Sequence, residues 1–300
     1  MLPKHISINE VGARDGLQNE KINISAEEKV KFINLLSLCN YKYIEVGSFV
    51  SAKWVPQMKN SDVVYKNIIK NKETIYPLLV PNTIGLKNAL ESDVKTICVF
   101  ATASESFSKK NTNTSIEQTK KNIKEILKIA IKNNIKIRAY MSCVLGCPYE
   151  GKVSYKKTAN LANFLIDEGC YEVSLGDTVG YGTPLETQKL INEVSNKINF
   201  SKIAMHLHDT YGQALANIYA SMQMGISSFD TSVGGLGGCP YAKGASGNVA
   251  TEDVIYMLNG MGVDCGVDLQ KVLVASKFIY KILNRNIVSK TASAILSKQT

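Results

Sequence analysis

Two hydrophobic patterns alternate along this chain. Short runs rich in β-branched and aromatic residues are separated by longer segments in which apolar residues recur at every third or fourth position. The short runs predict eight strands, at His5–Glu10, Tyr43–Phe49, Thr74–Val80, Thr96–Ala101, Lys136–Cys143, Tyr171–Asp177, Ile203–Asp209 and Ser227–Val233. The longer segments predict helices, including Ala26–Cys39, Ile116–Lys132, Tyr155–Glu168, Leu185–Lys197 and Ala214–Met224.

This alternation of strand and helix predicts a parallel sheet joined by right-handed crossovers. Eight such units in 300 residues favour an α/β fold of the (β/α)8 or TIM-barrel type, formed as a single domain over residues 1–300. An open doubly wound sheet would normally carry a nucleotide-binding fingerprint after its first strand, and Gly12–Gly16 does not match G-x-G-x-x-G. A further periodic segment, Leu269–Leu283, predicts an extra C-terminal helix.

Active sites of such barrels lie at the C-terminal ends of the strands, where the unusual polar residues of this chain also fall. These are Arg14 and Asp15 after the first strand, Glu45 in the second, Asp177 closing the sixth, and His206 and His208 closing the seventh. Charged side chains in buried strands are costly unless paired or ligated. We expect Glu45 and Asp177 to serve substrate binding. For Glu45, a purely structural ion pair with Arg14 is an equally good interpretation.

The segment His206-Leu207-His208 places two of only three histidines one residue apart in a predicted strand. Alternate strand residues share a face, so the two Cα atoms are separated by roughly 7 Å and both imidazoles can reach one metal ion. Two unrelated polar residues at a strand edge are the alternative. Asp15 after the first strand and Asn248 after the last would complete an open site for a hard divalent metal, which favours the metal hypothesis.

The segment Gly234–Asn248 follows the last predicted strand and contains six glycines. Such a loop can adopt positive φ angles and move, as a lid over an active site must. Phosphate cradling is disfavoured, because no G-x-x-x-x-G-K-[ST] motif is present. Cys239 lies between Gly238 and Pro240 in this mobile glycine-rich loop, where it could deliver a proton when the loop closes. An inert surface cysteine is the alternative.

Composition narrows the possible partners and the compartment. The net charge is +9, but the lysines are spread over predicted helix faces, which disfavours nucleic acid and allows a weak attraction for anionic substrates. No apolar run is long enough to cross a membrane, and neither a signal segment nor a peroxisomal C-terminal tripeptide is evident, so we expect a cytoplasmic protein. Seven scattered cysteines fit a reducing compartment, with Cys143 and Cys147 structural.

Several motifs together resemble the hydroxymethylglutaryl-CoA lyase family over nearly the whole chain. They are Val11–Glu20, Ser48–Met58, Ser142–Gly151, His206–Asn217 and Gly234–Asn248. The Arg-Asp-Gly and His-x-His elements alone are shared with a wider superfamily that includes isopropylmalate and homocitrate synthases and carboxylase transferase domains. The loop sequence Gly-Gly-Cys-Pro-Tyr-Ala-x-Gly-Ala-Ser-Gly-Asn is the specific feature, and it favours the lyase.

The resemblance implies cleavage of 3-hydroxy-3-methylglutaryl-CoA to acetoacetate and acetyl-CoA by a homodimer, in leucine breakdown or ketone-body formation. It implies that Asp15, His206, His208 and Asn248 bind Mg²⁺ or Mn²⁺. Arg14 would contact the substrate and stabilise the enolate, and Cys239 would be the acid that protonates it. Either Asp15 or His206 would take the hydroxyl proton.

Two other functions stay open at this point. A superfamily condensing enzyme would join acetyl-CoA to a 2-oxo acid with the same metal ligands, and the Cys239 loop argues against it. A non-catalytic barrel that only binds a metal or an anion is also compatible with the fold. The presence of Arg14 beside a full set of ligands argues against this second alternative.

Overall fold

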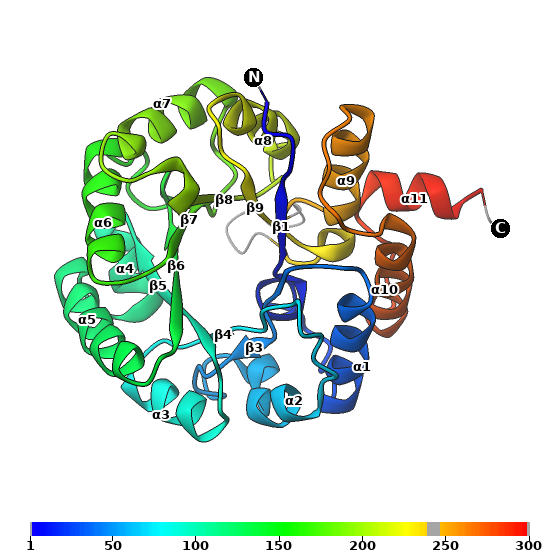
Figure 1. The fold of residues 1–300 in the computed structure, drawn as a ribbon, viewed down its shortest axis with the longest axis horizontal. Coiled ribbons are helices and arrows are strands. Elements are labelled where there is room, and N and C mark those ends of the chain that lie inside the picture. The colour runs from blue at the N-terminus through cyan, green and yellow to red at the C-terminus, as the bar shows by residue number, and fades with distance from the viewer. Residues whose placement is uncertain (1, 239–246, 299–300) are drawn as a thin grey trace.

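The computed structural model describes residues 2–238 and 247–298. Figure 1 shows a ring of strands around a central axis with helices outside it. Every strand pairing is parallel, which confirms the predicted barrel. The strands are β1 Ser7–Glu10, β2 Tyr43–Ile44, β3 Gly47–Ser48, β4 Leu78–Leu79, β5 Thr96–Thr102, β6 Lys136–Ser142, β7 Glu172–Asp177, β8 Ile203–Leu207 and β9 Ser228–Thr231.

The predicted second strand is divided in two in the structure. Its first part, β2, pairs with β1, whereas its second part, β3, pairs with β4, so the sheet order runs β2-β1-β9-β8-β7-β6-β5-β4-β3. Between the two parts, the backbone N–H of Glu45 donates to Glu10 and that of Val46 donates to Pro77. One stretch of chain therefore contacts strands on both sides and closes the barrel, with Glu45 at the point of closure.

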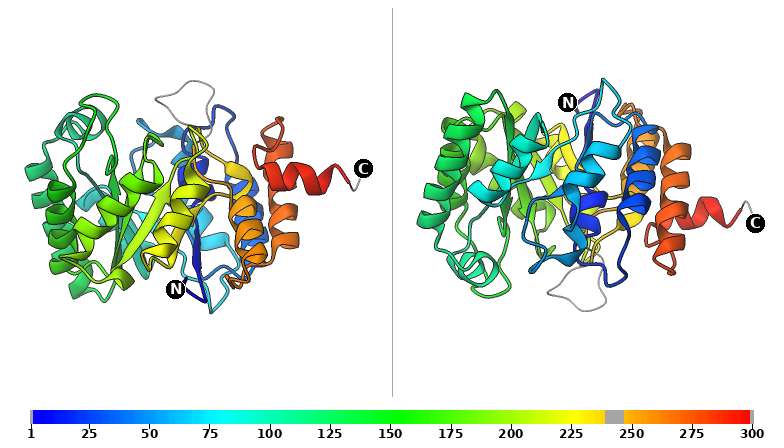
Figure 2. Two further views of the ribbon diagram at one scale, coloured as in Figure 1. Left: turned by 90° about the horizontal axis from the view of Figure 1, so that it is seen from above. Right: turned by 90° about the horizontal axis from the view of Figure 1, so that it is seen from below.

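The six helices predicted by residue range are present, with ends shifted by at most two residues, and five further helices accompany them among the described residues. They are α1 Ala26–Ser37, α2 Ser61–Asn67, α3 Thr83–Glu91, α4 Glu105–Thr112, α5 Ile116–Lys132, α6 Tyr155–Asp167, α7 Pro184–Ser195, α8 Ala214–Gln223, α9 Thr251–Gly260, α10 Leu269–Ile282 and α11 Lys290–Leu296. The predicted C-terminal helix is α10. A further short helix, α11, projects away from the barrel (Figure 2). Across the described residues, no helix is long and apolar enough to span a membrane.

Local sequence signals explain where several helices begin. Ser25 caps α1 and forms a reciprocal capping box with Glu28. Ser115 caps α5, whose buried residues Ile123, Ile126, Leu127 and Ala130 form one apolar stripe. Such stripes pack against the outer face of the strands, so the main hydrophobic core lies between the barrel and its helices.

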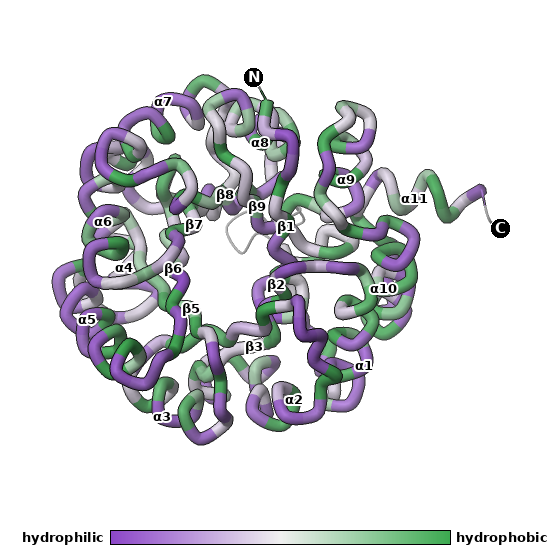
Figure 3. Tube along the Cα trace, in the orientation of Figure 1, coloured by the Kyte–Doolittle hydropathy of each residue, from purple (hydrophilic) through white to green (hydrophobic). Residues whose placement is uncertain are grey.

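The inside of the barrel is polar. Register pairs Asn9 with Asp230, and Asp230 with His206, and paired residues of parallel strands project to the same face. Buried polar side chains from several strands meet on this inner face: Asn9, Tyr43, Glu45, Arg138, Tyr140, Ser174, His206 and Asp230. Figure 3 accordingly shows hydrophilic positions on strands around the axis, for example on β1 and β6.

Candidate active site

The turn that carries Arg14 and Asp15 follows β1 directly. It is a single π-helical turn, Gly12–Gly16, and the carboxylate of Glu10 accepts the backbone N–H of Gly12 at 2.7 Å. The same carboxylate accepts the N–H of Val233 at 3.0 Å, after β9. A Cβ at position 12 would lie 2.6 Å from Glu10 Oε1, so any larger residue would displace this carboxylate. Glu10 thus joins the ends of two neighbouring strands beneath the site.

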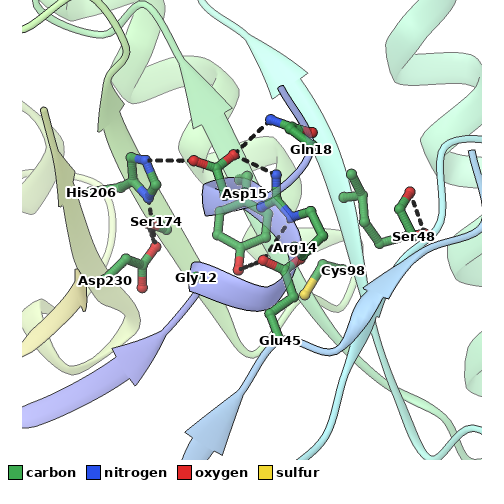
Figure 4. A network of polar contacts seen from close by, with 12 residues as sticks. Gly12, Arg14, Asp15, Gln18, Glu45, Ser48, Cys98, Ser174, His206 and Asp230 are labelled. Atoms are coloured by element: carbon green, nitrogen blue, oxygen red, sulfur yellow. Dashed lines mark hydrogen bonds and ion pairs between the residues drawn. The ribbon is translucent and has the colours of Figure 1, made fainter. Parts of the chain in front are cut away.

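Three predicted metal ligands converge at the C-terminal end of the barrel. His206 lies in β8 and His208 follows it immediately, and their Nε2 atoms are 3.2 Å apart. Asp15 Oδ2 lies 3.8 Å from His206 Nε2, as Figure 4 shows. One potential ligand atom from each residue lies within 4.8 Å of the others. The structure therefore brings Asp15, His206 and His208 together from distant parts of the sequence.

Asn248 lies beside this cluster. Its backbone forms an antiparallel bridge with His208, and its side-chain Nδ2 donates to Asp15 Oδ2 at 2.9 Å and to the Leu236 carbonyl at 3.2 Å. The amide nitrogen is therefore committed to two acceptors. The amide oxygen is the atom of Asn248 that could bind a metal.

The donor set fits a divalent cation. Neutral imidazoles and a carboxylate all present lone pairs, and the two imidazole Nε2 atoms lie 3.2 Å apart, close enough to bind one cation. Two imidazoles with oxygen donors and positions left for substrate suit Mg²⁺ or Mn²⁺ better than a closed thiolate zinc site. Asp15, His206, His208 and Asn248 could together hold such an ion.

The electrostatics of the cluster favour an ionised Asp15. Burial alone would raise the pKa of Asp15, but the Arg14 guanidinium, followed by the two histidines, lowers it to about 2. Burial opposes charging of His206 as well, yet its hydrogen bond to Asp230 and the nearby carboxylates raise its pKa. Burial and repulsion by His206 lower the pKa of His208 to about 3, which leaves its imidazole neutral. A neutral imidazole beside a carboxylate is suited to bind a cation.

Arg14 is held between two carboxylates. Its Nη1 donates to Asp15 Oδ1 at 2.6 Å and its Nε lies 2.8 Å from Glu45 Oε2 (Figure 4). Its guanidinium also lies over the ring of Tyr140, 4.9 Å from the centroid. Glu45 is fully buried and accepts the Tyr140 hydroxyl at 3.0 Å. The structure therefore places Glu45 as the ion-pair partner that orients Arg14.

Asp177 ends β7 but has different partners from the cluster. Its carboxylate accepts the backbone N–H groups of Tyr181 at 3.1 Å and Gly182 at 2.8 Å. Burial raises its pKa to about 6, against the effect of these amides. These bonds hold the loop between β7 and α7, so Asp177 is not brought into contact with Asp15, His206 or His208.

The cysteines divide into two groups. Cys239, with Pro240 and the rest of residues 239–246, lies outside the described residues. The six cysteines that the structure does describe are all buried and free of disulfides. Cys143 and Cys147 follow β6, where Ser104 Oγ lies 2.9 Å from Cys147 Sγ. Their contacts fit the predicted structural role.

Sequence reasoning missed two charged residues inside the barrel, Arg138 on β6 and Asp230 on β9. Arg138 donates to Asp230 through both terminal nitrogens, and Asp230 contacts His206. Both lie in predicted strands, so the signal that singled out Glu45, a charge within a buried parallel strand, could also have found them. Tyr140, which contacts Glu45, carries no such charge signal.

Comparison with known proteins now decides the family. The HMGL-like family profile matches residues 5–279. This chain belongs to the HMGL-like family. It is 52% identical over 293 residues to the cytoplasmic 3-hydroxy-3-methylglutaryl-CoA lyase of Rattus norvegicus, covering 98% of this chain and 85% of the relative. The family resemblance drawn from the sequence motifs is thereby confirmed.

Solved structures of the family agree with this result. The hydroxymethylglutaryl-CoA lyase of Pseudomonas aeruginosa superposes with a TM-score of 0.97 at 50% identity, covering 99% of each chain. An HMG-CoA lyase of Acinetobacter baumannii, solved with coenzyme A and 3-methylmalate, has a TM-score of 0.93 at 31% identity and covers 97% of this chain and 95% of its own. Both comparisons support the barrel fold of this family member.

Proposed function

We propose that this protein cleaves 3-hydroxy-3-methylglutaryl-CoA into acetoacetate and acetyl-CoA. The observation that carries this proposal is the position of Asp15. Its carboxylate lies between the Arg14 guanidinium and the two imidazoles of His206 and His208. A permanent cation therefore lies next to a metal-binding cluster, and both can act on one substrate. The lyase relatives act on this substrate by name.

Asp15, His206, His208 and Asn248 would hold Mg²⁺ or Mn²⁺ in this proposal. The ion would supply Lewis acidity toward the substrate oxygens, which lowers the pKa of the tertiary hydroxyl. Either Asp15 or His206 would accept the hydroxyl proton. The bond between C2 and C3 then breaks, acetoacetate leaves as the ketone, and the electron pair passes to the acetyl-CoA enolate.

Arg14 would stabilise the enolate in our proposal. Its Nη1 donates to Asp15 Oδ1, and its Nε forms an ion pair with Glu45 Oε2. A guanidinium stays charged at every pH relevant to catalysis, and in a site shielded from water its charge acts strongly on a developing oxyanion. Glu45 would assist by fixing the direction of the guanidinium.

Cys239 would return a proton to the enolate carbon to complete acetyl-CoA. This assignment rests on the family resemblance of its loop, since Cys239 lies outside the described residues. We further propose that Asp177 contributes to substrate binding by holding the Gly180–Gly182 backbone at the end of β7.

We also propose an acyl-CoA substrate and a homodimeric assembly. A family structure contains coenzyme A, which supports the CoA portion of the substrate. The net charge of +9 favours encounter with a negatively charged CoA ester. A cytoplasmic location and a role in leucine breakdown or ketone-body formation remain predictions of the sequence.

The test is an assay of the purified chain with hydroxymethylglutaryl-CoA and Mg²⁺, in which acetoacetate and acetyl-CoA are measured together. We expect equal amounts of both products and no reaction after chelation of the metal. A parallel reaction receives acetyl-CoA and 2-oxo acids. Condensation without cleavage would replace the lyase with a condensing enzyme, and inactivity in both reactions would favour a binding protein.

A further inference from the structure

The two site histidines differ in what holds the ring nitrogen that faces away from the cluster. His206 Nδ1 lies 3.3 Å from Asp230 Oδ2, and both side chains are buried. His208 Nδ1 is also buried, but it finds no hydrogen-bond partner in the described part of the chain. Of the two imidazoles, only that of His206 contacts a carboxylate through Nδ1. The role of this carboxylate, Asp230, follows from its own contacts.

Asp230 is surrounded by donors. Arg138 Nη2 donates to Oδ1 at 2.7 Å and Nη1 donates to Oδ2 at 3.2 Å. Ser174 Oγ donates to Oδ2 at 2.6 Å, and Asn9 Nδ2 donates to Oδ1 at 3.0 Å. Each donor stabilises the charged form of a carboxylate that is 2% exposed. Asp230 is therefore an anionic acceptor fixed on all sides.

Arg138 is itself rigidly held. Its side chain is fully buried, and its Nε contacts Glu172 Oε1 at 2.5 Å. Its guanidinium lies over the rings of Tyr43 and Tyr140, at 5.0 and 5.1 Å from their centroids. Ion pairs and stacking therefore fix the plane of the guanidinium, and through it the plane of the Asp230 carboxylate.

We infer that Asp230, held by Arg138, is a positioning residue that fixes the tautomer of His206. Asp230 offers only an acceptor to Nδ1, so the proton of neutral His206 resides on Nδ1 and the lone pair of Nε2 points at Asp15 and His208. The inference rests on the proposed metal site. A carboxylate behind a metal-binding imidazole sets ring orientation and raises ligand basicity.

The structure also shows what Asp230 prevents. His206 Nε2 lies 3.2 Å from His208 Nε2. Without an acceptor at Nδ1, His206 could move its proton to Nε2 and donate it to His208. That hydrogen bond would join the two rings and remove the His206 lone pair from the site. The same strand pairing of His206 with Asp230 that builds the barrel thus selects the competent tautomer.

The first test reads the tautomer directly in the metal-free wild-type protein. The chain has three histidines, so ¹⁵N-histidine labelling gives three imidazole patterns in a long-range ¹H–¹⁵N correlation spectrum. Three variants assign these patterns, because each should lack the pattern of the histidine that it replaces. They are His5→Gln, His206→Gln and His208→Gln. At a pH where His206 is neutral, we expect its proton on Nδ1. A proton on Nε2 of His206 would overturn the inference, whatever any variant does.

The second test uses Asp230→Asn, which keeps the side-chain shape. The amide oxygen should take the shorter Arg138 contact, at 2.7 Å, which turns the amide NH₂ toward His206 Nδ1 and drives the proton to Nε2. We expect the His206 pattern to change tautomer while His5 keeps its own. Mn²⁺ affinity, measured by electron paramagnetic resonance, should fall ~10- to 100-fold.

The matched control is Glu172→Gln, which removes the other carboxylate on Arg138 without touching His206. It should keep the His206 tautomer and Mn²⁺ affinity within twofold of the wild type. Asp230→Asn with unchanged tautomer and affinity would overturn the inference, even if activity were lost. Equal weakening in Glu172→Gln would reduce Asp230 to a structural role and overturn it too. If the wild type itself failed to bind Mn²⁺, the proposed metal site would fail first.

Discussion

Two buried carboxyls inside the barrel, Asp15 and Asp230, behave differently from two outside it, Glu10 and Glu252. On the inner side, Asp15 and Asp230 lie beside guanidinium groups, and their pKa values are lowered although burial opposes ionisation. On the outer side, Glu10 and Glu252 are equally buried, but burial raises the pKa of each to about 7. Burial is common to both regions. A guanidinium partner outweighs burial at Asp15 and Asp230, whereas at Glu45, which also contacts Arg14, burial outweighs the partner and raises the pKa.

The outer carboxyls hold backbone. Both oxygens of Glu252 accept the N–H of Gly234, at 3.0 and 2.8 Å, and Ser276 also contacts this carboxyl. Glu10 accepts the N–H groups of Gly12 and Val233. A backbone N–H can donate to a carboxyl oxygen whether or not the carboxyl is ionised. Glu10 and Glu252 can therefore hold their loops without a positively charged partner. Among the described residues, the buried arginines Arg14 and Arg138 contact Asp15 and Asp230, and neither contacts Glu10 or Glu252.

Removing the inner arginine should have the largest effect on stability. Arg138→Met leaves Asp230 charged and buried without its cation, which should lower the free energy of unfolding by about 3–5 kcal/mol. Glu252→Gln, in the outer region, should cost about 1 kcal/mol near pH 6, because it replaces one partly neutral acceptor by another. Urea denaturation of both variants measures the difference. An equal loss of unfolding free energy in the two variants would mean that Asp230 and Glu252 do not differ in their need for a positively charged partner.

The outer pair should make stability fall as the pH rises. The usual pKa of a glutamate is 4.5, and in the folded protein Glu10 and Glu252 titrate at about 7. Between these values the unfolded chain releases a proton that the folded chain keeps. The contribution is therefore full below pH 4.5 and lost by about pH 7, with up to about 3 kcal/mol per group.

Urea denaturation at pH 5 and pH 7.5 checks this prediction. The slope with pH should be steeper in the wild type than in Glu252→Gln, whose amide does not titrate. The inner Asp15 has the opposite sign: its stabilising contribution is present above its usual pKa of 3.8 and is lost as pH falls toward 2. An identical pH slope in wild type and Glu252→Gln would contradict the raised pKa of Glu252.

Arg14 tests whether the inner charges serve chemistry. Arg14→Gln should lower kcat by at least ~100-fold with a much smaller change in KM, because the guanidinium acts on the enolate. Arg14→Lys should also be poor, since an ammonium cannot reproduce contacts to both Asp15 and Glu45. Steady-state kinetics with hydroxymethylglutaryl-CoA decide the matter. An effect confined to KM would make Arg14 a ground-state binding residue.

A suitable control for Arg14→Gln is Lys95→Gln. Lys95 forms an exposed ion pair with Asp93 just before β5, at the N-terminal end of the barrel. Surface pairs of this kind contribute little, so kcat and KM should stay within twofold of the wild type.

The smallest effect is expected for the neutral ligand of the inner cluster. Asn248→Ala should weaken Mn²⁺ binding ~10-fold, less than Asp15→Ala, because an amide oxygen adds no negative charge. Titration of Mn²⁺ by paramagnetic relaxation compares the variants. His5→Ala, which removes the histidine paired with Asp264 at the other end of β1, serves as the control and should bind Mn²⁺ normally. Unchanged affinity in Asn248→Ala would remove it from the site.

The sequence by itself determined the repeating elements and much of the candidate site. Apolar periods predicted strands and helices because burial on one face requires them. The barrel hypothesis then placed Arg14, Asp15 and His206 at one end, because parallel strands of a barrel end on the same side. Alternation along the predicted strand Ile203–Asp209 placed His208 on the same face as His206. These inferences needed only chain direction and side-chain periodicity.

Only the tertiary structure decided which charges pair and which carboxyls ionise. Arg138 and Asp230 are 92 residues apart, and they meet because the closed barrel brings β6 and β9 across one interior. Asp177 carries the same sequence signal as Glu45, yet it contacts loop amides whereas Glu45 contacts Arg14. A pKa depends on burial and on charges within a few ångströms, and those neighbours come from strand register and barrel closure.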